Sequence, residues 1–243
     1  MCTVTLTPIK GSQKGFILTS NRDEATGRET LPPAVYSEQG IRMVFPKDVV
    51  GGGTWLGVSE MKRAICLLNG EFEKHDRQPP YRLSRGVVVK DLLAASRFDQ
   101  SLRDYELKGV EPFTMIIVDW KTTLKFTEFV WDGRIKHIRN LPLVPHIWSS
   151  SPLYTTEMKE QRDKWFQDFM EKNHLTSDKL LQFHSSAGVG DKEIDVIMDR
   201  GFIKTQSISQ VKYSGDRLRF YYHDLTKKEV SEKSFSEELS DLF

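Results

Sequence analysis

A cysteine follows the first methionine, and its chemistry depends on that position. Cys2 opens the β-rich run CTVTLTP. Removal of Met1 would leave it with a thiol and a free α-amine, and an α-amine titrates near pH ~8, so it can accept the thiol proton. The thiolate is the nucleophilic form of cysteine, so one residue could serve as nucleophile and general base in amide cleavage. The plainer interpretation is a small buried residue in a strand, which is common for free cysteine.

Four polar residues end the next β-rich run, where a hairpin would bring them beside Cys2. The run GFILTS is followed by Asn21, Arg22, Asp23 and Glu24. In that arrangement Arg22 would lower the pKa of the thiol, and Asp23 or Glu24 would accept a hydrogen bond from the α-ammonium. An isolated segment of this kind is more often a solvated turn, so both interpretations stay open.

A further polar pair stands at the end of an apolar run, RAICLLNG. The side-chain NH₂ of Asn69 and the backbone N–H of Gly70 could form a two-donor oxyanion hole, although Asn-Gly also makes plain turns. Upstream, VVGGGTWLGVS predicts a tight glycine turn, and Gly53 and Trp55 are candidates for lining the pocket. A core role for Trp55 is the commoner alternative.

Composition excludes several classes of function. The chain has 243 residues, and 35 basic against 34 acidic residues give a net charge of +1 without a basic block, so no nucleic-acid partner is expected. Cys2 and Cys66 are too few for a disulfide framework, which fits a cytoplasmic protein. The first residues contain no long apolar segment and no apolar run reaches about 18 residues, so neither a signal peptide nor a membrane span is expected. No zinc-ligand spacing occurs, and we expect no cofactor or metal, but a small-molecule substrate or ligand.

The pattern of elements predicts an α+β protein with large antiparallel sheets and helices outside them. Helices are expected at Ser84–Phe98 and, with a clear amphipathic stripe, at Thr155–Asn173. FTMIIVDW and LKFTEFVWDG predict a hairpin. A short strand is expected at Glu193–Met198, and the acidic tail from Ser231 is expected to fray.

Several of these stretches together resemble one family. MCTV, SNRDE and GGTWLGVS, with the apolar strand that ends in Asn69, are similar to the NRDE family, also called the transport and Golgi organisation protein 2 family. The runs Ser149–Leu153 and Thr205–Ser209 resemble its later signposts, so the similarity covers most of the chain. The resemblance implies one domain over 1–243 with the N-terminal nucleophile (Ntn) hydrolase fold, a four-layer αββα sandwich of two antiparallel sheets.

The resemblance also implies a site. Cys2 would be the nucleophile, and Asn21, Arg22, Asp23 and Glu24 would be the catalytic tetrad. Asn69-Gly70-Glu71 is similar to the Asn-Gly-Glu of class II glutamine amidotransferases, in which Asn and Gly form the oxyanion hole, whereas the NRDE family usually continues after Asn with an aromatic residue and Arg.

Two functions therefore stay open. The first is an amidohydrolase that cleaves a small non-peptide carbon–nitrogen bond through a Cys2 thioester after Met1 removal. The second is a non-catalytic intracellular binding or trafficking protein on the same fold, handling haem or acyl lipids. The state of the α-amine separates them, because a blocked amine cannot act as the base.

Overall fold

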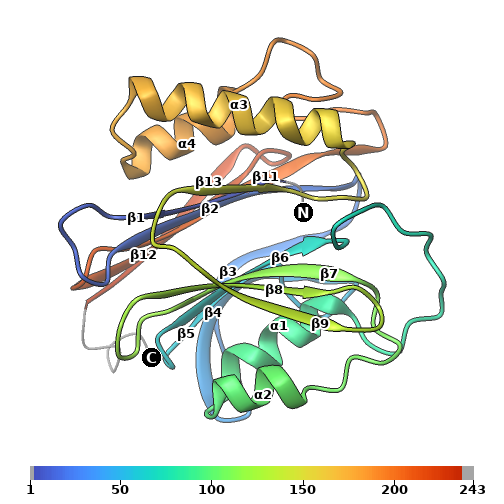
Figure 1. The fold of residues 1–243 in the computed structure, drawn as a ribbon, viewed down its shortest axis with the longest axis vertical. Coiled ribbons are helices and arrows are strands. Elements are labelled where there is room, and N and C mark those ends of the chain that lie inside the picture. Colours follow the sequence, from blue (N-terminus) through green and yellow to red (C-terminus); the bar gives the residue numbers. More distant parts are fainter. Residues whose placement is uncertain (1–2, 237–243) are drawn as a thin grey trace. The chain divides into compact units, whose positions relative to one another are not determined.

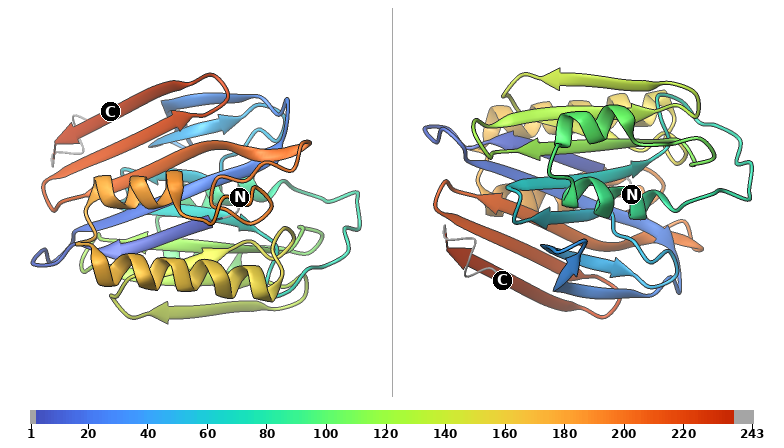
Figure 2. Two further views of the ribbon diagram at one scale, coloured as in Figure 1. Left: turned by 90° about the horizontal axis from the view of Figure 1, so that it is seen from above. Right: turned by 90° about the horizontal axis from the view of Figure 1, so that it is seen from below.

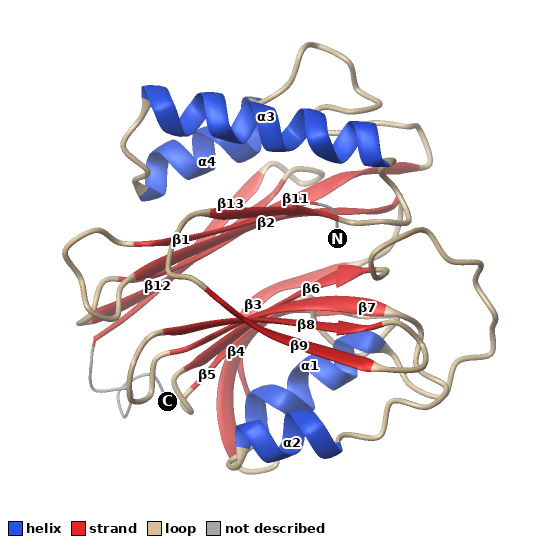
Figure 3. Cartoon of the chain, viewed as in Figure 1, coloured by secondary structure: helices blue, strands red, loops and turns tan. Residues whose placement is uncertain are grey.

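The computed structural model describes residues 3–236, and their contacts group into two compact units. The first unit combines the chain up to Arg28 with residues 143–236, and the second spans Glu29–Pro142. Each unit contains one antiparallel sheet and two helices (Figures 1 and 3). The predicted α+β class with two antiparallel sheets is therefore confirmed. The single domain over 1–243 stays a prediction.

The first unit has a six-stranded sheet in the order β10-β1-β2-β11-β12-β13. Its strands are β1 (Thr3–Pro8), β2 (Phe16–Ala25), β10 (His146–Ser149), β11 (Ile203–Tyr213), β12 (Arg217–Asp224) and β13 (Glu229–Ser236). Helices α3 (Thr156–Lys172) and α4 (Ser177–Ser186) cover one face of this sheet (Figure 2). An apolar cluster of Ile17, Phe166, Leu180, Phe183 and Val196 joins the sheet to the two helices.

The second unit has a seven-stranded sheet whose spatial order follows the sequence from β3 to β9. Its strands are β3 (Thr30–Glu38), β4 (Ile41–Asp48), β5 (Leu56–Ser59), β6 (Arg63–Asn69), β7 (Phe113–Asp119), β8 (Lys125–Trp131) and β9 (Lys136–Leu141). Helix α1 (Arg85–Ala94) packs against β4, β5 and β6, and α2 (Phe98–Asp104) follows it. The predicted hairpin of FTMIIVDW and LKFTEFVWDG is confirmed as β7 and β8.

Strands β1 and β2 form the hairpin expected at the start of the chain. Thr3 pairs with Asn21, and the ladder continues to the pair of Pro8 and Phe16. Strand β2 does not stop at Ser20, because β11 pairs with its other edge as far as Ala25. The four polar residues thus belong to a central strand rather than to a turn.

The helix predicted at Thr155–Asn173 is confirmed, with a Thr155 side chain that accepts a hydrogen bond from the Met158 N–H. The helix predicted at Ser84–Phe98 is confirmed as α1, but it ends earlier than expected, because the backbone at Ala95 is extended (ψ 119°), and Phe98 already begins α2. The prediction of a frayed tail is wrong over 231–236, which pair with β12, and the rest of that tail lies outside the described residues.

The strand expected at Glu193–Met198 is wrong, because the segment folds back on itself. The N–H groups of Ile194 and Asp195 both donate to the Asp191 carbonyl. The Asp195 carboxylate accepts hydrogen bonds from the N–H groups of Val189 and Gly190. These bonds make a compact loop, hereafter the 191–198 loop.

Candidate active site

Cys2, the predicted nucleophile, lies outside the described residues, which begin at Thr3. Thr3 itself pairs with Asn21 on β2 and with Ser149 on β10. The start of β1 is therefore flanked by a strand on each side.

The alternation of β2 divides the predicted tetrad between the two faces of the sheet. Ile17 lies in the apolar cluster with α3 and α4, so Asn21 and Asp23 face the helices as well. Arg22 and Glu24 belong to the opposite face. All four residues lie in one strand, but each face of the sheet carries only two of their side chains.

Asn21 is fully buried and bonded at both ends of its amide. Its Nδ2 donates to the carbonyls of His184 (3.0 Å) and Val196 (2.6 Å), and its Oδ1 lies 2.6 Å from Nδ1 of His184. Because Nδ2 must face the two carbonyls, Oδ1 is the acceptor and His184 Nδ1 carries the hydrogen. The other ring nitrogen, Nε2, then accepts the hydroxyl hydrogen of Thr5 at 2.8 Å.

His184 is the neutral centre of this network. Burial, together with a smaller effect of the nearby charge of Arg162, lowers the pKa of His184 to about 3. The ring is therefore uncharged at neutral pH. It links β1 to β2 through directional hydrogen bonds that exist in one tautomer only.

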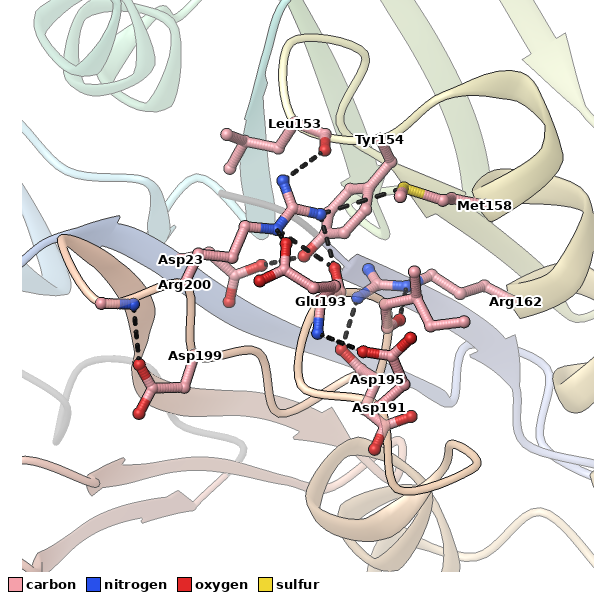
Figure 4. Close-up of polar contacts among 12 residues, drawn as sticks. Asp23, Leu153, Tyr154, Met158, Arg162, Asp191, Glu193, Asp195, Asp199 and Arg200 are labelled. Carbon is pink, nitrogen blue, oxygen red and sulfur yellow. Dashed lines mark hydrogen bonds and ion pairs between the residues drawn. The ribbon is translucent and has the colours of Figure 1, made fainter.

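Asp23 is held by two hydroxyl groups. Tyr154 donates to its Oδ2 at 2.7 Å (Figure 4). Thr205 donates to its Oδ1 at 2.6 Å. Thr205 reaches it because β11 carries a bulge, in which Thr205 pairs with Asp23 and Ser207 with Arg22 while Gln206 is the extra residue. Asp23 thus ties β2, β11 and the segment before α3 together.

On the opposite face, Arg22 is almost completely buried, with 3% of its side chain exposed. Its guanidinium lies 4.0 Å from the carboxylate of Glu24, which also pairs with Arg28 at 3.6 Å. Burial acts to raise the pKa of Glu24, but the Ala25 N–H and the charges of Arg28 and Arg22 are among the groups that leave it below its ordinary value. Arg22 and Glu24 form the charged part of this face of β2.

Asn69 and Gly70, the predicted oxyanion donors, belong to the second unit. Asn69 ends β6 opposite Phe113, and its side chain makes no hydrogen bond within residues 3–236. Gly70 has a positive φ of 80°, and its N–H donates to the carbonyl of Pro112 at 3.2 Å. Of the two predicted donors, the Asn69 amide is the one that has no acceptor among residues 3–236.

The glycine turn has a packing function. A Cβ on Gly53 would lie 2.3 Å from the carbonyl carbon of Gly86, at the start of α1, and Gly52 has a φ of +65°. The tight turn expected there is present, and glycine at 53 is required by close backbone approach. Trp55 is buried in the same region, with 3% of its surface exposed. The pocket-lining role of Gly53 and Trp55 stays a prediction.

Sequence reasoning missed four residues of the first unit's buried network: Tyr154, Arg162, His184 and Thr205. For one of them a signal existed, because Arg162 stands four residues from Met158 and from Phe166, inside the apolar stripe of α3. A charged residue in such a stripe indicates a buried partner. Thr205 opens a run that the resemblance had singled out, but no local pattern predicts its contact with Asp23, because its orientation follows from the bulge.

Neither a metal site nor a membrane span is found in the described part of the chain. No group of three or more His, Cys, Asp or Glu side chains among residues 3–236 could hold a metal ion. None of the helices formed by these residues is long and apolar enough to cross a bilayer.

Similar folds occur in three solved amidohydrolases. Penicillin V acylase from Agrobacterium tumefaciens is 13% identical over 95% of this chain and 85% of its own, with a TM-score of 0.57. The N-acylethanolamine-hydrolyzing acid amidase orthologue of Caenorhabditis elegans is 11% identical over 86% and 92%, with a TM-score of 0.58. A variant of conjugated bile acid hydrolase from Clostridium perfringens is 10% identical over 97% and 96%, with a TM-score of 0.55.

At these identities the likeness establishes the fold alone, and that fold is the Ntn-hydrolase fold expected from the sequence. Among curated proteins, none matches the sequence. The family model "Transport and Golgi organisation 2", however, matches residues 1–213. The stretches MCTV and SNRDE, the two antiparallel sheets and this match agree, and the chain belongs to the Transport and Golgi organisation 2 family.

Proposed function

We propose that this protein is an Ntn-type cysteine amidohydrolase that acts on small non-peptide amides. After Met1 is removed, the α-amine of Cys2 takes the thiol proton and the thiolate attacks the amide carbonyl. The carbon–nitrogen bond breaks, the protonated amine leaves, and the acyl group remains on sulfur as a thioester. Water then adds to the thioester, which releases the acid and restores the thiol.

The observation that carries the proposal is the register of the first hairpin. Thr3 pairs with Asn21, so an antiparallel ladder continued by one residue would set Cys2 opposite Arg22. Arg22 is a nearly buried cation, and a cation beside a thiol favours the thiolate. The amide-hydrolysing activities of proteins with the same fold are consistent with this chemistry.

The faces of β2 suggest different roles within the tetrad. Arg22, with Glu24 as its carboxylate partner, acts on the thiol from the face opposite the helices. Asn21 and Asp23 have their polar atoms bonded on the helix side, so they act by holding the strand in place. The oxyanion role of the Asn69 amide is a separate proposal, which comes from the residue types at this strand end and from the resemblance.

The test begins with the mass of the intact protein. We expect loss of Met1 and a single addition at Cys2 after brief exposure to iodoacetamide, while buried Cys66 stays unmodified. A panel of N-acyl anilides and N-acyl amino acids then reports turnover. Cys2→Ala is expected to abolish turnover, and Cys66→Ala is the matched control that retains it.

Two outcomes would overturn the proposal. One is a protein that keeps Met1, since its α-amine is then not on Cys2. The other is a Cys2→Ala variant with full turnover. Equilibrium binding of haem or a fatty acyl ligand that is unchanged by Cys2→Ala, without turnover of any amide, would instead support the carrier function.

A further inference from the structure

Arg162 is a completely buried cation in the first unit, and its contacts are unusual for one. Its exposed fraction is 0%, yet none of its hydrogen-bond acceptors among the described residues is a carboxylate. Nε donates to the carbonyl of Ile194 at 2.9 Å and one terminal nitrogen to that of Asp195 at 2.6 Å. A buried charge is costly unless it is fully hydrogen-bonded, so these acceptors define where the guanidinium can sit.

The remaining terminal nitrogen reaches the start of β1. Nη1 of Arg162 donates to the hydroxyl oxygen of Thr3 at 2.6 Å, across 159 residues of sequence. Thr3 is the residue directly after Cys2 and the first residue of the ladder with β2. The charged group therefore holds the end of the strand that carries the proposed nucleophile.

The plane of the guanidinium is fixed as well. It stacks on the ring of Tyr154, with its central carbon 3.7 Å from the ring centroid, and the Tyr154 hydroxyl donates to Asp23 (Figure 4). The 191–198 loop supplies the carbonyls of Ile194 and Asp195 that accept from Arg162. The next carbonyl of this loop, that of Val196, accepts from Asn21. The same loop thus holds Arg162 from α3 and Asn21 from β2.

We propose that Arg162 is a positioning residue that fixes the start of β1, and with it Cys2, in register with β2. The inference rests on the proposed function only in assigning a reaction to Cys2. Arg162 does not touch the reacting atoms. A lysine could not replace it, because an ammonium lacks the planar fork that meets three acceptors and a ring face at once.

The chain offers a matched pair of threonines for the test. Thr3 and Thr7 are both buried in β1 and, being four residues apart, face the same side of the sheet. The Thr3 hydroxyl accepts from Arg162, whereas the Thr7 hydroxyl has no partner among the described residues. Thr3→Val removes the acceptor at constant shape, Thr3→Ser keeps it, and Thr7→Val makes the same change without touching Arg162.

Two readouts are measured on each folded variant: the rate of Cys2 alkylation by iodoacetamide, and hydrogen exchange of the amides of β1. We expect Thr3→Val and Arg162→Lys to slow alkylation about tenfold, because the charge-assisted hydrogen bond that positions the start of β1 is lost. Both variants should also speed exchange at residues 3–6. Thr3→Ser and Thr7→Val should match the parent protein in both. A role limited to global stability would shift the melting temperature and leave the alkylation rate of the folded protein unchanged.

The outcomes separate this inference from the proposed function. Parent-like alkylation and exchange in Thr3→Val would overturn the positioning role of Arg162 and leave the amidohydrolase proposal intact. A second outcome combines two measurements: Thr3→Val exchanges faster at residues 3–6, and Cys2 of the parent protein reacts no faster than free cysteine. This outcome would sustain the anchoring of β1 by Arg162 and overturn the proposed chemistry.

Discussion

The layer between sheet and helices contains a polar network beside its apolar cluster in the first unit, whereas in the second unit it is mainly apolar. Beneath α3 and α4 the buried polar residues include Thr3, Thr5, Asn21, Asp23, Arg162, His184 and Thr205. The buried face of α1 consists of Gly86, Val88, Val89, Leu92, Leu93 and Ala94. The described polar contacts from β5 and β6 to α1 lie at the end of the helix. The Ser59 hydroxyl donates to the carbonyl of Leu93. The Arg63 guanidinium donates to the carbonyls of Leu92 and Ala95.

The two layers act on their sheets in different ways. Apolar contacts are non-directional, so they stabilise α1 on its sheet and tolerate small shifts. Hydrogen bonds among buried groups hold only in one geometry, and a missing partner is costly. The first unit places such bonds under the hairpin that begins directly after Cys2, where a shift of one residue would turn every side chain to the other face.

The largest loss of stability in the polar network is expected for Arg162→Met. It keeps the length of the side chain but leaves the carbonyls of Ile194 and Asp195 and the Thr3 hydroxyl without their donor. We expect a loss of about 3–5 kcal/mol in the free energy of unfolding, measured with urea. Lys172→Met, at the last turn of the same helix, is the control and should change stability by less than about 0.5 kcal/mol. A small loss for Arg162→Met would show that the layer does not depend on its charge.

A shape-conserving exchange in each unit sharpens the contrast. Asn21→Leu removes a buried amide that serves His184 and Val196, and should cost about 3 kcal/mol of unfolding free energy because several polar groups lose their partners. Leu92→Met in α1 should cost about 1 kcal/mol, as is usual for apolar exchanges of similar volume. Equal costs, measured by urea titration of both variants, would contradict the distinction between the two layers.

Acid should weaken the polar layer before the apolar one. The pKa of His184 is about 3 in the folded protein and 6.5 as its ordinary value, so below pH 6.5 the unfolded chain binds a proton that the folded chain does not. His184 therefore contributes stability above pH 6.5 and loses it as the pH falls toward 3, by about 1.4 kcal/mol per pH unit or about 2 kcal/mol at pH 5. His184→Gln should flatten this part of the pH profile of thermal unfolding. An unchanged slope in that variant would assign the acid sensitivity to other groups.

The smallest expected effect concerns Thr5, whose hydroxyl donates to Nε2 of His184. Thr5→Val leaves that nitrogen without a donor and should cost about 1 kcal/mol of unfolding free energy. Thr5→Ser should cost less, because it keeps the donor. If Thr5→Val stabilises the protein in urea, the hydrogen bond between Thr5 and His184 does not contribute to the stability of this layer.

Most of the fold could be predicted because its signals are local. The runs around the first hairpin, the amphipathic stripe of α3 and the β7–β8 hairpin each contain their own pattern, and each is confirmed. The 191–198 loop could not be found in this way. Its shape comes from the Asp195 carboxylate bonding two N–H groups five and six residues upstream, and no periodicity encodes that.

The sequence was enough to name the candidate residues on β2, but not the direction in which each of their side chains points. The four residues from Asn21 to Glu24 stand out in the sequence, yet their division between two faces depends on how β2 is covered by α3 and α4. Alternation would also have put Thr205 on the same face as Ser207, and the bulge at Gln206 reverses this. The partners of Asn21 and Asp23 therefore became visible only in the assembled unit.

The contact between Gly53 and Gly86 restricts how the second unit can change. A methyl group on either residue would meet main-chain atoms of the other segment at under 3 Å. Main chain has no rotamers to swing aside, so repacking nearby side chains could not rescue such a substitution. A suppressor mutation would have to displace α1 itself, and the glycine turn and the helix are therefore expected to vary only as a linked pair.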